Sequence, residues 1–176
     1  MTTGDVKFWL RERGTETIDH PGGTLYAHLG RVHDRLAGFG HGPDVCLAGL
    51  AHAVYGTDGF DLTLLDPGDR APLRHLVGER AEALVYLYGA CDRSRTWKVL
   101  PENRQVWNRW TGVAAPLPDD LATGFADLSI VNELDVAEHD ASVAQKHGPY
   151  FRSVFTTWQG LASEPVLAEA SRVFAA

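Results

Sequence analysis

The feature that most constrains the fold is a segment that is apolar on every side of a helix. Residues 45–54 read Val-Cys-Leu-Ala-Gly-Leu-Ala-His-Ala-Val, and His52 is their single strongly polar side chain. A helix without a polar face must be covered all round, so it belongs at the centre of a helical bundle. Pro43 and Asp44 precede it and suit the first turn of such a helix.

Helical patterns elsewhere supply the elements that would cover this segment. Leu25, Leu29, Val32 and Leu36 recur at helical spacing and form one apolar stripe. Between residues 92 and 118 the helical period weakens. Further helices are expected near residues 5–13, 78–90, 119–138 and 150–161, and after 163–165. The prediction is an all-α, single-domain helical bundle spanning residues 1–176.

Composition restricts the class of protein. The chain has 176 residues, of which 44% are apolar and 22% charged, and a formal net charge of −7. This length fits one domain, and the apolar content argues against disorder. The acidic balance disfavours a nucleic-acid surface. Charges interrupt the start of the chain, no run reaches the ~18 apolar residues of a membrane span, and Cys46 and Cys91 form no CxxC pair. We therefore expect a cytoplasmic protein with a small-molecule substrate and neither nucleic acid nor membrane as partner.

Two histidines stand at core positions. His28 lies at the edge of the apolar stripe, and His52 ends the most apolar helix. Either one alone is typical of a core histidine with a hydrogen-bond partner, because an unpartnered buried polar group costs ~1–3 kcal/mol. Two of them on consecutive core helices, followed by an acidic residue on a later helix, are also typical of a site for iron, manganese or zinc. We expect His28 and His52 to face one another between these two helices, because the apolar stripes that they end must pack together. The other histidines, in polar surroundings, are most simply solvated; they are His33, His41, His75, His139 and His147.

At these residues the sequence resembles the HD superfamily. His28-Leu29-Gly30-Arg31-Val32 is similar to the HxxRV histidine of that family, and residues 48–53, Ala-Gly-Leu-Ala-His-Ala, resemble its histidine–aspartate pair. Residues 78–85 look like the following helix of the alarmone hydrolases, and Ala126-Asp127-Leu128 with Asn132 looks like their ADxLxN segment. The resemblance covers about residues 24–135, with C-terminal helices in residues 137–176 completing an HD-type bundle. It implies metal ligation by His28, His52 and Asp127.

The sequence departs from the family at carboxylates. Ala53 stands where the HD aspartate helps to hold the metal, and Gly56 and Thr57 stand where alarmone hydrolases carry the acidic pair of the hydrolytic step. Asn132 is displaced by one residue. The remaining two histidines and one carboxylate would suffice for a mononuclear site with one divalent metal, iron or manganese. A site without any metal is the equal alternative.

Neighbouring residues have a functional and a plainer interpretation. Tyr55 could face the same cavity as an acid, or plug the helix end. His20 could close over a pocket or lie in a loop, and Asp58 could replace the missing carboxylate or simply belong to a turn. Glu133 could add a carboxylate, or be an exposed helix charge. We include His28, His52 and Tyr55 as catalytic candidates.

The segment from Trp97 to Trp110 holds three tryptophans among basic side chains. It could stack a planar ligand or clamp an anion, or form an irregular lid packed on the bundle. Trp107 and Arg109 from this segment, together with His20 and Asn132, are the substrate-binding candidates.

Three functions remain. The first is a metal-dependent phosphohydrolase of HD type, in which the metal activates a water molecule. The second is a non-hydrolytic biosynthetic enzyme on the same scaffold, such as an oxygenase, lyase, isomerase or cyclase, using His28, His52 and Asp127. The third is an HD-like protein that binds a small ligand without chemistry, since fold alone does not fix function. We favour the second, because it tolerates the loss of a metal ligand.

Overall fold

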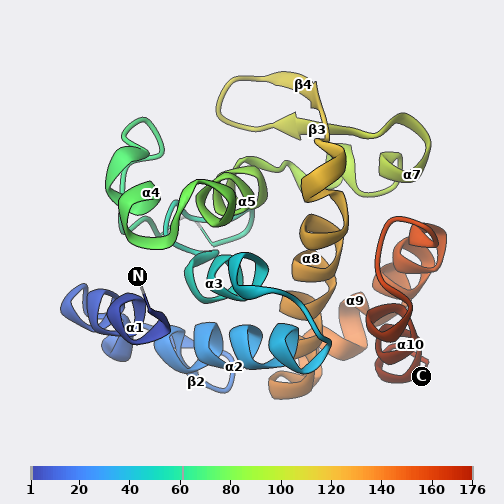
Figure 1. Cartoon of the computed structure of the whole chain (residues 1–176). Coiled ribbons are helices and arrows are strands. Elements are labelled where there is room, and N and C mark those ends of the chain that lie inside the picture. Colours follow the sequence, from blue (N-terminus) through green and yellow to red (C-terminus); the bar gives the residue numbers. More distant parts are fainter. Residues whose placement is uncertain (1, 61, 176) are drawn as a thin grey trace.

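Helix α8 (Asp119–His139) runs through the middle of the molecule and is buried along most of its length (Figure 1). The structure is a computed structural model that describes residues 2–60 and 62–175. Within those residues the chain is mostly helical (65%) and forms one compact domain with ten α-helices and two small hairpins. The expected helical bundle is confirmed at this level, and the hairpins are an addition to it.

Helix α3 (Pro43–Ala51) is the predicted central helix. It packs against α1 (Thr3–Glu12), α2 (Leu25–Gly38), α5 (Glu79–Ala90) and α8, so neighbours cover it on several sides. The helix ends earlier than the apolar pattern, and His52 follows as its C-cap. The apolar stripe on α2 is buried as expected. These two helices place His28 and His52 in the same part of the core.

A short hairpin directly precedes α2 in the chain. Strand β1 (Asp19–His20) pairs antiparallel with β2 (Gly23–Thr24), after the 3₁₀ turn η1 (Thr15–Thr17). Gly22 has φ +82°, and a Cβ there would lie 2.6 Å from the His139 ring, so the turn favours glycine. The Thr24 side chain then accepts the Ala27 N–H and caps α2.

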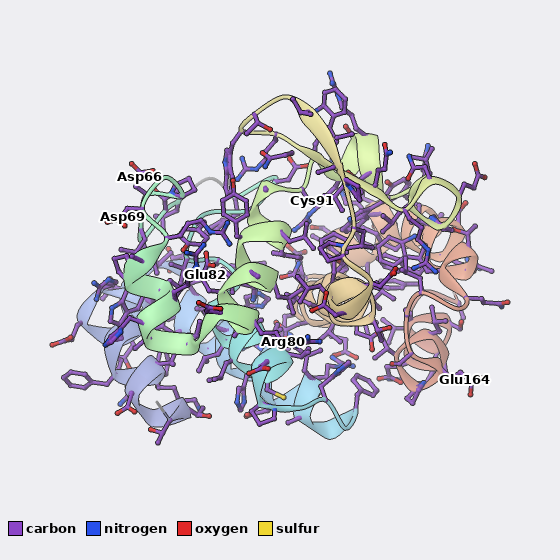
Figure 2. The ribbon with its side chains drawn as sticks, turned by 45° about the horizontal axis from the view of Figure 1, so that its top comes forward. Asp66, Asp69, Arg80, Glu82, Cys91 and Glu164 are labelled. Carbon is purple, nitrogen blue, oxygen red and sulfur yellow. The ribbon has the colours of Figure 1, made fainter. Side chains whose placement is uncertain are left out.

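Helices α4 (Ala71–Val77) and α5 meet at a buried carboxylate. Gly78 separates them with φ +89°. Glu82 on α5 is fully buried, and it accepts hydrogen bonds from Arg70, Arg74 and Tyr55 (Figure 2). A buried charge needs such partners, and here they hold the loop before α4 against α5.

The weakly periodic segment contains mixed structure. It holds the short helices α6 (Arg93–Thr96) and α7 (Leu100–Asn103), followed by strands β3 (Gln105–Asn108) and β4 (Val113–Pro116). The strands pair antiparallel, with Trp107 opposite Ala114. This hairpin lies beyond the end of α5, at the top of Figure 1.

The C-terminal helices pack on the other side of α8. Helix α9 spans Ala141–Phe155, the 3₁₀ turn η2 spans Thr156–Trp158, and α10 spans Glu164–Val173. The expected helix over 150–161 was therefore wrong in both bounds. Asp140 accepts the Ser142 N–H and caps α9, so the helix begins earlier. No helix among the described residues is long and apolar enough to cross a bilayer.

Candidate functional site

Two imidazoles meet between α2 and α3. Nε2 of His28 lies 3.2 Å from Nε2 of His52, and the rings are nearly perpendicular. Both side chains are about 98–99% buried. The expectation that these two histidines face one another is confirmed. Their outer nitrogens and their surroundings decide what the pair can do.

Each imidazole is held at its other nitrogen. Nδ1 of His28 lies 2.6 Å from a carboxylate oxygen of Asp135, and Nδ1 of His52 lies 2.7 Å from the Gly49 carbonyl oxygen. Both partners accept hydrogen bonds, so both Nδ1 atoms carry hydrogens. His52 therefore turns a lone pair at Nε2 toward His28 in its neutral form.

Asn132 places a second acceptor at the same point. Its amide nitrogen donates to Glu133 at 3.0 Å, which fixes the orientation of the amide. Oδ1 of Asn132 then lies 3.1 Å from Nε2 of His28. Nε2 of His28 thus faces two acceptors, and these contacts are satisfied when it carries a hydrogen. A His28 ring with hydrogens on both nitrogens would be an imidazolium, and the Asp135 carboxylate lies where it would pair with that charge.

Arg31 completes the support of His28. Its guanidinium donates to both oxygens of Asp135, at 2.7 and 2.9 Å, and to the carbonyls of Pro21 and Gly22 in the turn between β1 and β2. The same hairpin stacks His20 on His28, with ring centroids 4.0 Å apart. Arg31 therefore holds both the β1–β2 hairpin and the buried carboxylate of Asp135 in place.

Burial and charge set the protonation of the cluster. Burial, and then the nearby His28 charge, lower the pKa of His52 to about 3 and that of His20 to about 4. Burial alone would raise the pKa of Asp135, but hydrogen bonds and charges from His28 and Arg31 outweigh it and hold that pKa well below its ordinary value. At neutral pH, Asp135 is a carboxylate, while His20 and His52 are neutral.

His52 borders a cavity of about 270 Å³, and His28 lies behind it. Its wall includes His20 from the hairpin, His52 and Ala53 after α3, and Asn132 and Glu133 on α8. The loop of residues 57–60 closes another side. This volume suits a small metabolite, below the size of most drug-like ligands.

Arg93 and Glu133 form an ion pair in the cavity wall. Nη1 of Arg93 donates to Glu133 at 2.7 Å, and Nη2 donates to the Tyr88 hydroxyl at 2.8 Å. The Arg93 backbone N–H donates to Asp58 at 2.9 Å. The alternative that Glu133 is an exposed helix charge is therefore wrong, because its side chain is only 7% exposed. Asp58 also lines the cavity.

The structure does not bring Asp127 to the histidine pair. Its carboxylate lies 2.7 Å from Nε2 of His41 and accepts the Ser163 N–H at 2.9 Å. Five residues separate Asp127 from Asn132, which is ~140° of helical rotation and ~7.5 Å along the axis. The predicted ligand thus lies on another face of α8. His41, expected to be solvated, has a side chain only 14% exposed.

Three further candidates lie apart from the pair. Tyr55 is fully buried and donates to Glu82, and burial followed by this hydrogen bond raises its pKa above the ordinary value. Trp107 lies on β3 with Arg95 over its ring, and Arg109 donates to the Gly89 carbonyl. None of the three is among the residues that line the cavity, whereas His20 and Asn132 are.

The predicted metal ligands therefore fit only in part. Among the described residues, no group of three or more His, Cys, Asp or Glu side chains is placed to hold a metal ion. The donors that converge are two imidazole nitrogens and the Asn132 amide oxygen. Anchored Nδ1–H groups are also what metal-bound histidines show. Because this donor set lacks a carboxylate, we derive no chemical step through a metal.

Sequence reasoning missed Asp135, Arg31 and Arg93. A signal for the first two was present: Arg31 follows His28 by three residues, and Asp135 follows Asn132 by three, so each pair shares a helix face. No comparable signal indicated Arg93, because a loop and a short helix bring it to the cavity.

Residues 9–93 match the family model of a domain of unknown function (DUF6817). The matched segment includes His28, Arg31 and His52, and it ends before Asn132 and Asp135. No curated protein and no solved structure matches the chain. The family match thus covers the three histidines of the cluster but not their partners on α8, and it carries no activity with it.

Proposed function

We propose that this chain is a small-molecule enzyme that transfers protons, with His28 and His52 as its acid–base pair. The observation that carries this proposal is the 3.2 Å approach of the two Nε2 atoms beside a cavity, while both Nδ1 atoms are held by fixed acceptors. Such anchoring is how proteins orient a histidine for acid–base work. A lyase or isomerase reaction fits this arrangement.

The proton between the imidazoles has a defined path. Nε2 of His28 carries it toward Nε2 of His52, and His52 borders the cavity. Because Nδ1 of His52 is held by the Gly49 carbonyl, a bound molecule takes this proton when its acceptor atom replaces Nε2 of His52 as the partner of His28, and His28 is left neutral. The reverse movement takes a proton from that molecule. Asp135, itself paired with Arg31, stabilises the charged form of His28.

We also propose that the chain is a degenerate relative of the HD superfamily. In support, His28, His52 and Asn132 come from α2, the end of α3 and α8, in the chain order that the resemblance implies. Ala53 stands where the resemblance places a metal-binding aspartate, and the carboxylate of Asp127 contacts His41 rather than the histidine pair. The absence of both acidic groups from the pair favours chemistry that the histidines perform themselves.

A metal-dependent enzyme, whether phosphohydrolase or oxygenase, is the second candidate. One observation favours it: two Nε2 atoms and one amide oxygen converge, and the Nδ1 atoms are anchored as in metal sites. Iron or manganese would be the cofactor. Metal analysis of protein purified without chelator separates the candidates. About one equivalent of bound metal that disappears in His52→Gln supports this second function.

The test of proton transfer uses a neutral probe. Exchange of the α-hydrogens of cyclohexanone in D₂O requires protonation of the carbonyl oxygen or removal of a C–H proton, and NMR follows it directly. Wild-type protein should exchange at least tenfold faster than His28→Gln and His52→Gln. His33→Gln is the matched control, because His33 pairs with Asp34 outside the cluster. Equal rates in all four proteins would contradict the proposal and leave ligand binding without chemistry.

A further inference from the structure

Acidic side chains outnumber basic ones among the residues that line the cavity beside His52. Asp19, Asp58 and Glu133 are acidic, and Arg93 is the single Lys or Arg in that lining. Asp19 comes from the hairpin, Asp58 from the loop after α3, and Glu133 from α8. Three different segments therefore contribute negative charge to the cavity.

The one guanidinium is already engaged. Arg93 donates to Glu133 and to the Tyr88 hydroxyl, and its guanidinium carbon lies 5.1 Å from the centroid of the Trp97 ring. Glu133 neutralises its charge at 2.7 Å. An anion entering the cavity would have to break this pair to gain a cationic partner, and it would still meet Asp19 and Asp58.

Asp58 is held in a fixed place at the cavity. Its Oδ2 accepts the backbone N–H of Arg93 at 2.9 Å, and its loop is closed by backbone hydrogen bonds between Thr57 and Phe60. The Arg93 guanidinium acts on this carboxylate only at longer range, because it is paired directly with Glu133 and the Tyr88 hydroxyl. A fixed carboxylate of this kind is a preorganised partner for a cationic group.

The remaining wall is largely apolar. Leu25, Phe60 and Val136 line it, together with Ala53 next to His52. Apolar lining with a few fixed polar groups is typical of sites that bind small organic molecules. The cavity therefore combines an apolar wall that can contact the apolar part of a ligand, the carboxylate of Asp58, and His52 from the histidine pair.

We propose that the cavity binds a small organic amine, with its ammonium group at Asp58 and its apolar part against Phe60 and Leu25. This inference rests on the proposed function above, because it names the substrate class of the same site. With its ammonium group at Asp58, the amine lies in the cavity that His52 borders. Carboxylates and phosphate esters of the same size are rejected by the acidic lining.

Four matched probes test this charge preference. Benzylamine, benzyl alcohol, benzoate and benzyl phosphate share an aromatic ring and differ in charge. Each is titrated into ¹⁵N-labelled, chelator-treated full-length protein, and NMR follows the His52 side chain and the amides of residues 57–60. Benzylamine should bind at least tenfold more tightly than benzyl alcohol, and both anions more weakly than the alcohol.

Charge-removing variants assign the preference to the cavity. Asp58→Asn keeps an acceptor for the Arg93 N–H and should reduce benzylamine affinity to that of benzyl alcohol. Asp19→Asn, at an exposed position of the hairpin, should weaken benzylamine binding two- to threefold. Asp69→Asn makes the same change in net charge on an exposed loop before α4 (Figure 2) and should leave all affinities unchanged.

The two proposals fail in different ways. Tighter binding of either anion, no binding of any probe, or a preference for benzylamine that survives Asp58→Asn and Asp19→Asn together would overturn the amine proposal. Cyclohexanone carries no charge, so its exchange tests proton transfer independently. Benzylamine selectivity without ketone exchange would retain the substrate class and reject the acid–base role.

Discussion

Helix α8 carries two buried histidine–carboxylate contacts that look alike in distance and differ in consequence. His28 lies 2.6 Å from Asp135, and His41 lies 2.7 Å from Asp127. Both carboxylates are at most 2% exposed. The difference lies in what surrounds each contact.

At Asp135 the surroundings leave the imidazole ready for chemistry. Arg31 balances the carboxylate, and the far nitrogen of His28 meets His52 beside a cavity. At Asp127 the second oxygen accepts the Ser163 N–H just before α10. That contact joins the α2–α3 loop, α8 and α10, so we interpret it as a structural brace. A histidine–carboxylate distance alone therefore does not define a site.

The largest effect should come from removing charge at Asp135. In Asp135→Asn the buried His28 and the partly exposed Arg31 lose their buried anionic partner, which typically costs about 3–5 kcal/mol of unfolding free energy. Urea unfolding measures this loss. A loss below that of Asp127→Asn would contradict the difference between the two contacts.

Adding a carboxylate at position 53 should destabilise the protein less. Ala53 is 2% exposed beside His52, and Ala53→Asp would add charge near Asp58 and Glu133. Without a cationic partner the change should lower the unfolding free energy by about 2–3 kcal/mol and create no phosphatase activity. A thermal melt with manganese and a generic phosphodiester assay checks this. Higher stability, higher metal affinity and new turnover together would favour the metal-dependent function instead.

The sequence allowed one half of the histidine site to be predicted and not the other. The apolar stripe on α2 and the apolar helix α3 were sufficient to predict that His28 and His52 converge, because side-chain periodicity fixes which face is buried. The partner on α8 was predicted wrongly, since Asp127 was chosen by motif resemblance while Asp135 occupies the face that meets α2. The strands at Trp107 and the contacts of Arg93 depend on tertiary packing, which a local pattern does not encode.

Acidification should lower the unfolding free energy through His52, in the His28–His52 region, by about 2 kcal/mol. The pKa of His52 in the folded protein is about 3, below its ordinary value of 6.5. Between these two pH values the unfolded chain binds a proton at His52 and the folded chain does not. Stability therefore falls as pH drops below 6.5, by about 2 kcal/mol from His52 between pH 7 and pH 5. Unfolding of chelator-treated wild type and His52→Gln at both pH values measures this contribution of His52 to the unfolding free energy. An equal pH dependence in the two proteins would show that His52 is not desolvated.

The smallest of these effects should come from Asp127→Asn. The amide retains one acceptor for the Ser163 N–H or for His41, so we expect a loss of about 1 kcal/mol. Cyclohexanone exchange and benzylamine binding should be unchanged, as measured by the assays above. A tenfold loss of either would place Asp127 in the functional site after all.

The central claim is that one proton lies between His28 and His52, and side-chain ¹⁵N NMR of the metal-free protein at pH 7 tests it most directly. His28 should show both ring nitrogens protonated, and His52 should show the neutral form with hydrogen on Nδ1 only. Replacing Asp135 by Asn should remove the doubly protonated His28 signal, while Asp127→Asn should leave both patterns intact. Two neutral histidines in wild-type protein, each with a lone pair at Nε2, would contradict the shared proton and indicate a site built for a metal ion.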